Sequence, residues 1–184
     1  MANNYILSIS DDYPESYWLK AKVLSGEDSS IFKEGLVVTK SVIVRFESAK
    51  RISAAKLLAY DFFFSDGPNL ISPRLYELMV NEGISGVQFI DAELIVSGVS
   101  YAGYKIFNVV TRSAVFDLEK SESEPLLSYL PDGPRWYSKI VLAEGANLPN
   151  DIVRAEEEIA TIVVAARVKT IFEENNICGL QFKA

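Results

Sequence analysis

The chain has 184 residues, which is the usual length of a single domain and enough to bury a core without disulfides or metals. Its composition, 49% hydrophobic and 23% charged, excludes a disordered chain, and its formal charge of −7 argues against nucleic-acid binding, which needs lysine and arginine to replace counterions. The longest apolar stretch, Ile159 to Ala166, contains Thr161 and is far shorter than the roughly 20 residues that cross a bilayer, so no membrane partner is expected.

The first part of the chain is predicted to be rich in strands. From Leu36 to Phe46 apolar and polar residues alternate with a period of two, which predicts one long, half-buried strand. The sequence Asp66-Gly67-Pro68 favours a turn that connects two further strands. The other strands expected in this part are Tyr5–Ile9, Tyr17–Leu24, Asp61–Phe64 and Asn69–Ser72.

A helix is predicted to begin at Ser72-Pro73. A serine oxygen can cap the free amides of a first turn, and proline is tolerated at the first helical position. Apolar residues between Leu75 and Met79 recur at spacings of three and four, which places them on one face of this helix. Gly83 is suited to end it in the left-handed conformation.

The second half of the chain is predicted to contain a long loop, further strands and a second helix. The segment from Leu118 to Pro134 is acidic and rich in proline, which predicts the longest loop of the chain. The apolar run Ile159–Val164 leads into a final helix and a terminal strand. Strands are expected at Val87–Phe89, Leu94–Val96, Tyr104–Val110 and Lys139–Leu142, and a turn at Gly145–Asn150.

An internal repeat connects the two predicted helices. The sequence RLYELMVNEGISGVQF, from Arg74 to Phe89, aligns without gaps with RVKTIFEENNICGLQF, from Arg167 to Phe182. The two copies share five of their 16 residues, where about one identity is expected by chance. Asn176 stands in the place of Gly83, and both residue types tolerate the left-handed end of a helix.

The repeat predicts the fold class. Each copy reads as strand, helix, turn and strand, and two copies are too few for a solenoid. We therefore expect a single α+β domain, 1–184, with a mixed or mostly antiparallel sheet. Two repeat-related strand–helix–strand units, 70–90 and 163–183, should pack their helices on it. The equivalent residues Arg74 and Arg167 are expected to form structural hydrogen bonds near the helix starts.

Most catalytic chemistry is absent from the sequence. There is no histidine, which removes Ser-His-Asp, Cys-His and imidazole–zinc sites, and the single cysteine, Cys178, cannot form a thiolate cluster. No glycine pattern typical of phosphate binding is present. We expect no catalytic residues, no cofactor and no metal. The lone cysteine and the lack of a secretory signal in the first ten residues favour the cytoplasm.

Three carboxylate pairs leave two interpretations open. They could serve acid–base chemistry or hold a magnesium ion, or they could be solvated surface charge, which is the usual situation of such residues and the interpretation we favour. The pairs are Asp11 with Asp12, Asp117 with Glu119, and Glu156 with Glu158.

Two segments resemble immunity protein family eleven, one of the bacterial families paired with polymorphic toxins. Asn147 to Phe182 is similar to that family's closing segment, which has the pattern Leu-Pro-x-Asp-Ile-x-Arg, then an apolar strand, a helix and Gly-apolar-x-Phe. Tyr104 to Glu122 is similar to its tyrosine-led strand and Asp-centred segment. The matching residues are Leu148, Pro149, Asp151, Ile152, Arg154, Gly179, Leu180 and Phe182 in the first segment and Asp117 and Ser121 in the second.

This resemblance, which extends in order from about Leu70 to Phe182, implies an immunity protein that binds a cognate toxin or secreted effector domain tightly and so protects the producing cell. The acidic charge suits a basic partner, because complementary charge raises association rates, although acidity also serves solubility alone. The alternatives are an interaction or scaffold protein with another partner, and a carboxylate-based enzyme or small-ligand module. A homodimer is left open.

The acidic loop and the aromatic residues beside it are the predicted contact surface. Aromatic side chains anchor protein interfaces, and charged side chains steer the encounter. The competing interpretation is a solvated connector whose aromatic residues only cover the edge of a sheet. The predicted partner-binding residues are Asp117, Glu119, Glu122, Glu124, Tyr129, Asp132, Trp136 and Tyr137.

Overall fold

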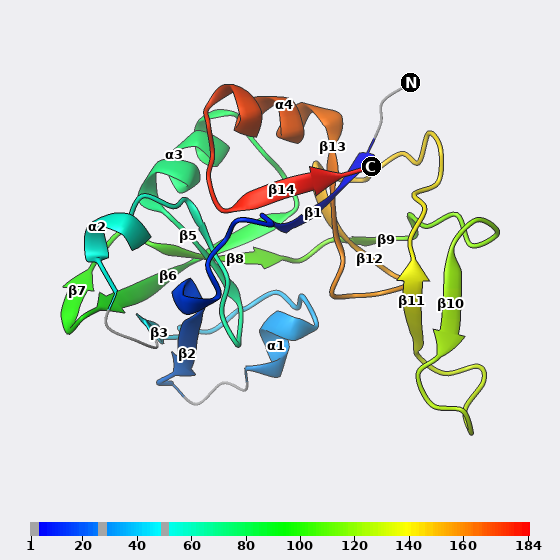
Figure 1. Ribbon diagram of the computed structural model, residues 1–184, viewed down its shortest axis with the longest axis horizontal. Coiled ribbons are helices and arrows are strands. Elements are labelled where there is room, and N and C mark those ends of the chain that lie inside the picture. Colours follow the sequence, from blue (N-terminus) through cyan, green and yellow to red (C-terminus); the bar gives the residue numbers. More distant parts are fainter. Residues whose placement is uncertain (1–3, 26–28, 49–51) are drawn as a thin grey trace.

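The protein has a mixed α+β structure in which strands outnumber helices, so the predicted class is confirmed (Figure 1). A computed structural model describes residues 4–25, 29–48 and 52–184. The helices of this part are η1 (Glu15–Tyr17), α1 (Ser30–Lys33), α2 (Ala54–Leu57), α3 (Pro73–Asn81) and α4 (Ala166–Glu174).

The larger sheet has seven strands, of which six follow the order β2-β3-β6-β8-β5-β4 while β7 pairs with the end of β6. Its pairs are antiparallel except for β3 with β6. The strands are β2 (Leu19–Val23), β3 (Val44–Ser48), β4 (Phe62–Phe63), β5 (Asn69–Ile71), β6 (Val87–Val96), β7 (Val99–Tyr101) and β8 (Lys105–Val109).

The second sheet has five strands in the order β14-β1-β13-β12-β9, and only the pair of β9 and β12 is parallel. Its strands are β1 (Asn4–Ile9), β9 (Arg112–Ser113), β12 (Ile152–Ala155), β13 (Ile162–Ala165) and β14 (Leu180–Lys183). A separate antiparallel ribbon consists of β10 (Glu122–Pro125) and β11 (Arg135–Lys139).

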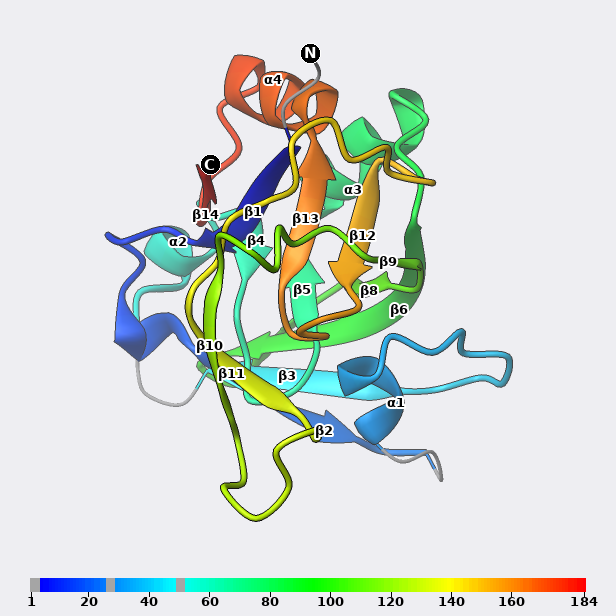
Figure 2. The same ribbon diagram turned by 90° about the vertical axis from the view of Figure 1, so that its right-hand side faces the viewer.

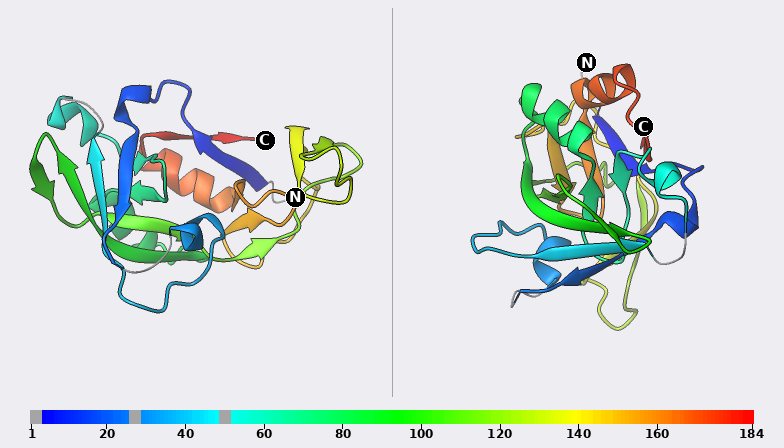
Figure 3. Two further views of the ribbon diagram at one scale, coloured as in Figure 1. Left: turned by 90° about the horizontal axis from the view of Figure 1, so that it is seen from below. Right: turned by 90° about the vertical axis from the view of Figure 1, so that its left-hand side faces the viewer.

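Neighbouring residues of the inner strands face different hydrophobic cores, because successive side chains in a strand point to opposite faces. In β5, Ile71 belongs to a central core and Leu70 to an outer core that includes β2, β3, α1 and α2. In β13, Val164 belongs to the central core and Val163 to a second outer core beside β11. The central core also receives the apolar sides of α3 and α4, which lie side by side at one end of the molecule (Figures 1 and 3).

Two segments of the chain follow one strand-pairing scheme. In the first, the hairpin β4–β5 leads through α3 to β6, and β8 lies between β5 and β6. In the second, the hairpin β12–β13 leads through α4 to β14, and the N-terminal strand β1 occupies the place that β8 has in the first. Corresponding pairs are Ile71–Lys105 and Val164–Tyr5, and Val87–Val109 and Leu180–Ile9.

The predicted boundaries of the first long helix are confirmed. The Ser72 hydroxyl accepts a hydrogen bond from the Leu75 amide at 3.1 Å, Pro73 stands in the first turn, and Gly83 follows the helix with a φ of 61°. Asn176 follows α4 with a φ of 51°. These caps satisfy backbone groups that a helix end otherwise leaves unpaired.

The strand predicted from Leu36 to Phe46 is wrong over most of its length, because β3 begins only at Val44. Val42 and Val44 are buried as the alternation requires, but the preceding residues do not join the ladder. The side-chain amide of Gln88 replaces a neighbouring strand there: it accepts from the Val38 amide at 2.9 Å and donates to the Val38 carbonyl at 2.7 Å.

The loop predicted from Leu118 to Pro134 is also corrected, since it contains β10. The strand predicted at Lys139–Leu142 is wrong except for its first residue, because β11 ends at Lys139. Most side chains of the ribbon are exposed or half-buried, so its pairing leaves little apolar alternation in the sequence. Backbone hydrogen bonding with a partner strand therefore overrides the low strand propensity of a segment that contains two glutamates and a proline.

Candidate binding surface

The ribbon of β10 and β11 and the loop 126–134 between them form the most exposed apolar surface of the described chain. Ribbon and loop stand at one side of the molecule, and the loop extends beyond the body (Figures 1 and 2). Tyr129 is 79% exposed and Trp136 is 55% exposed. Three leucines of the same loop are also exposed: Leu126, Leu127 and Leu130. Clustered exposed apolar side chains of this kind mark interaction sites more often than scattered ones do.

Backbone hydrogen bonds hold the loop in one conformation. The Leu126 amide donates to the Pro134 carbonyl at 2.8 Å, and the Leu130 amide donates to the Leu127 carbonyl at 2.9 Å. The Gly133 amide closes a further turn on the Leu130 carbonyl at 3.0 Å. The loop is therefore folded into turns and is not an extended connector.

Two of the eight predicted partner-binding residues, Asp117 and Tyr137, hold the ribbon in place and do not form its outer surface. The Asp117 carboxylate accepts from the amides of Glu119 and Lys120, both at 3.2 Å, and pairs with the Lys120 ammonium at 3.1 Å. The hydrogen bond from Lys120 lowers the pKa of Asp117. Tyr137 packs edge-to-face on buried Phe116, with ring centres 5.0 Å apart. Both residues fix where the ribbon begins.

The other predicted residues are brought together on the ribbon and its loop. Trp136 lies opposite Glu124 in the ladder, and Glu122 pairs with Lys139 at 3.6 Å. The carboxylates of Glu119, Glu124 and Asp132 form no ion pair with any residue of the described ranges. The surface therefore combines aromatic side chains with carboxylates that form no ion pair in this part of the chain, although Lys120 adjoins one of them.

The exposed leucines of the loop are residues that the sequence argument missed. Leu126, Leu127 and Leu130 stand within Pro125–Pro131, in a segment that composition alone marks as a polar connector. Their spacing of three and four would also suit one face of a helix, so periodicity gives no signal of their exposure. Pro125 and Pro131 bracket the segment, and no helix forms there.

The residues that carry the family resemblance are structural. Arg154 is buried, and its guanidinium donates to the carbonyls of Val109 at 2.9 Å, Ile159 at 2.9 Å and Phe32 at 3.1 Å. It thereby ties β12 to β8 and α1, and burial lowers its pKa. The Ser121 hydroxyl accepts from the Val141 amide at 2.9 Å, which fixes the start of the ribbon.

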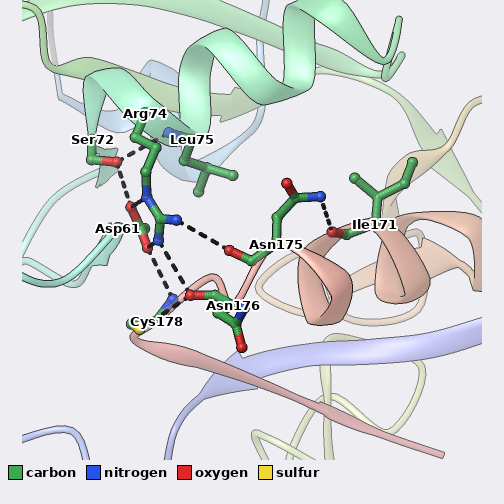
Figure 4. A network of polar contacts seen from close by, with 8 residues as sticks. All are labelled: Asp61, Ser72, Arg74, Leu75, Ile171, Asn175, Asn176 and Cys178. Carbon is green, nitrogen blue, oxygen red and sulfur yellow. Dashed lines mark hydrogen bonds and ion pairs between the residues drawn. The ribbon is translucent and has the colours of Figure 1, made fainter.

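A polar clasp joins the start of α3 to the end of α4, and Figure 4 shows it. The Arg74 guanidinium donates from Nε to the buried carboxylate of Asp61 at 3.0 Å and from Nη1 to the Asn175 carbonyl at 3.1 Å. The Ser72 hydroxyl and the Cys178 amide also donate to Asp61, at 2.8 Å and 3.1 Å. The bond with Asp61 raises the pKa of Arg74.

A second clasp joins the start of α4 to the end of α3. The Arg167 guanidinium donates to the Asp151 carboxylate at 2.5 Å and 3.0 Å and to the Gly83 carbonyl at 3.2 Å. The Ser85 amide and hydroxyl donate to Asp151 at 2.9 Å and 2.8 Å, as the Cys178 amide does to Asp61. The hydrogen bond from Arg167 lowers the pKa of Asp151 to about 2. The structural role expected for both arginines is confirmed.

Several members of the carboxylate pairs singled out in the sequence accept hydrogen bonds from other side chains. Asp11 accepts from the Gln181 side chain at 2.7 Å and Asp12 from the Ser10 hydroxyl at 2.8 Å. Glu158 accepts from the Thr161 hydroxyl at 2.5 Å. Within residues 4–25, 29–48 and 52–184, no group of three or more cysteine, aspartate or glutamate side chains is placed to hold a metal ion.

Comparison with known proteins adds no relative to this picture. No model of a known protein family matches the chain, and no curated protein matches it. None of the helices in the described ranges is long and apolar enough to span a membrane.

Proposed function

We propose that this chain is an immunity protein that binds a toxin or effector domain and neutralises it in the cytoplasm of the producing cell. The resemblance to immunity family eleven motivates the proposal, and the ribbon is the observation that carries it. Of the thirteen exposed large hydrophobic side chains in the described ranges, six lie between Leu118 and Trp136. A surface of this kind suits binding to another protein.

The ribbon has the two components of a tight interface. Tyr129, Trp136 and the loop leucines can enter apolar hollows of a partner, and such anchors supply most of the binding free energy of known interfaces. The carboxylates of Glu119, Glu124 and Asp132, which form no ion pair in the described ranges, lie in the ribbon, in its loop or just before it and would face basic groups of the partner. The formal charge of −7 adds long-range attraction to a basic partner.

We also propose that the two halves of the scaffold are repeat-related units. The sequence alignment between Arg74–Phe89 and Arg167–Phe182, the shared strand register and the two reciprocal clasps support this relation. Strand β1 then corresponds to β8, so the second unit is completed by the other end of the chain. The repeat forms the scaffold, and the ribbon, which has no counterpart in the first unit, carries the partner contact.

Co-expression tests the function. The candidate toxin is the C-terminal domain of a large secreted protein encoded next to this gene, and its expression alone should arrest growth. Co-expression of this chain should restore growth, and the two purified proteins should form a stable complex. Persistent arrest in the presence of soluble, abundant chain contradicts the proposal.

A matched set of variants tests the surface. The double variant Tyr129→Ala/Trp136→Ala should weaken the complex by a hundredfold or more, since each anchor contributes about 2 kcal/mol or more. Val80→Ala and Val99→Ala are the controls, because these side chains are similarly exposed but lie on α3 and β7. If the double variant protects fully, the proposed immunity function is still supported, but the ribbon is not the surface that contacts the toxin.

A further inference from the structure

A hollow lies where the chain passes from β1 to β2. Its volume is about 570 Å³, and it is open to solvent. None of its residues belongs to the ribbon, so it is a separate surface. The lining residues are Ile9, Ser10, Asp11, Tyr13, Glu15 and Trp18.

The floor of this hollow is rigid because it rests on an aromatic cluster. Tyr13 is only 6% exposed, and its ring packs edge-to-face on Tyr60 at 5.1 Å and on Phe64 at 5.4 Å. The Tyr13 amide donates to the Ser10 carbonyl at 3.0 Å, which closes the turn that carries Asp11. Burial raises the pKa of Tyr13 well above its ordinary value, so its hydroxyl stays neutral.

The walls of the hollow combine an indole with carboxylates. Trp18 is 42% exposed, and its ring centre lies 5.9 Å from that of Phe64, so the indole is held in place while part of it meets solvent. Gln181 of β14 donates to the Asp11 carboxylate at 2.7 Å and orients it. The Glu15 carboxylate has no ion-pair partner in the described ranges, and the lining contains no lysine or arginine.

We propose that this hollow binds an arginine side chain of a basic protein partner. Tryptophan is the aromatic side chain that attracts cations most strongly, and the planar guanidinium stacks on it. The same group donates to carboxylates through several N–H bonds, which Asp11 and Glu15 are placed to accept. A neighbouring hollow that shares Ser10 adds the carboxylate of Asp12, so the negative charge extends along the loop. The inference concerns this hollow alone and holds for any basic partner, toxin or not.

Tryptophan fluorescence tests the proposal directly, because the chain has two tryptophans. The variant Trp136→Phe leaves Trp18 as the only tryptophan, whose emission can be excited selectively over that of tyrosine. Titration with acetyl-Gly-Arg-Gly-amide should give a saturable change in Trp18 emission that weakens at high salt. The same peptide with citrulline, which keeps the shape and lacks the charge, should give none. The reverse variant, Trp18→Phe, should show no saturable response of Trp136.

Charge variants complete the test. Glu15→Gln and Asp11→Asn in the Trp136→Phe background should each weaken the arginine peptide by about tenfold, the usual effect of losing one hydrogen bond to a charged group. Thermal unfolding checks that both variants are folded. Asp11 is in contact with Gln181, so if Asp11→Asn does not fold, the affinity of Glu15→Gln alone decides the test. Equal responses to the arginine and citrulline peptides, or unchanged affinity in folded Glu15→Gln, would overturn the proposal.

Discussion

Arg74 and Arg167 each hold the end of the helix that the other one begins. Arg74, in the first turn of α3, donates to the carbonyls of Asn175 and Asn176 after α4, and Arg167, in the first turn of α4, donates to the Gly83 carbonyl after α3. The last carbonyls of a helix lack intrahelical partners and favour a cation. Each guanidinium therefore caps a neighbouring helix while a carboxylate fixes its position.

The first prediction concerns the buried carboxylate of the α3 clasp. Asp61 is 3% exposed and accepts from Arg74 and two further donors, so Asp61→Asn removes a buried, charge-assisted acceptor and should lower the free energy of unfolding by about 2 kcal/mol. Asp91→Asn is the control, because Asp91 pairs with Lys105 while its side chain is 89% exposed, and such pairs contribute no more than about 1 kcal/mol. Urea denaturation measures both. Equal losses of unfolding free energy in the two variants would show that the clasp contributes no more to stability than an ordinary surface ion pair.

The second prediction concerns acid stability. Arg167 lowers the pKa of Asp151 to about 2, whereas an unfolded aspartate titrates at about 3.9. A carboxyl group whose pKa is lower in the folded state stabilises the fold above its unfolded pKa, and this stabilisation is lost as the pH falls through the folded value. The free energy of unfolding should thus decline between about pH 4 and pH 2, and less steeply in Asp151→Asn. Arg167→Met should reproduce the shallower slope. If the free energy of unfolding of both variants depends on pH as it does in wild type, the pair of Asp151 and Arg167 is not the cause of the decline.

The third prediction concerns two glycines, each of which lies close to the backbone of a strand in the other sheet. A Cβ atom at Gly86 would lie 2.0 Å from the Ile152 carbonyl oxygen, and one at Gly179 would lie 2.4 Å from the Phe62 carbonyl oxygen. Both residues also have positive φ angles. Alanine at either position should cost about 3 kcal/mol or more, from backbone strain together with overpacking.

Gly98 provides the matched control for that prediction. Its φ of 83° carries the same kind of strain, but nothing lies within 4 Å of a Cβ there, so Gly98→Ala should cost only about 1 kcal/mol. If the interface variants do not fold, the comparison is made on soluble yield, where only Gly98→Ala should approach wild type. Similar stability of all three variants would mean that the close approach of the units is not a constraint.

The sequence predicts the elements whose signals are local. The capping of α3 by Ser72 and its end at Gly83 follow from residue chemistry, and the structure agrees. The β10–β11 pairing is not predictable in this way, since it depends on backbone bonds between exposed segments. The hollow at Trp18 is also not predictable from the sequence, because its floor depends on a contact between Tyr13 and Tyr60, which are far apart in the chain.

The final prediction concerns two cation–π contacts between a strand and a helix. In one the lysine is on the strand and the tyrosine on the helix, and in the other this arrangement is reversed. In the first unit the Lys105 ammonium, on β8, lies 4.9 Å from the ring centre of Tyr76 on α3. In the second unit the Lys169 ammonium, on α4, lies 5.3 Å from the ring centre of Tyr5 on β1. If β1 corresponds to β8, the double variant Tyr5→Lys/Lys169→Tyr recreates in the second unit the arrangement of the first.

The exchange is judged by its coupling energy because the single changes also have other effects. Lys169 forms an ion pair with Glu173 at 2.6 Å, which Lys169→Tyr removes and the exchange does not restore. A double-mutant cycle separates that loss from the contact between the two positions. The double variant should be more stable than the sum of the single changes by about 1–2 kcal/mol, because wild type and the exchange each contain one exposed cation–π contact that both single variants lack. A coupling of no more than about 0.5 kcal/mol, which the wild-type contact alone would produce, would mean that the exchange does not recreate the contact of Lys105 with Tyr76, and the proposed relation between the units would lose one of its supports.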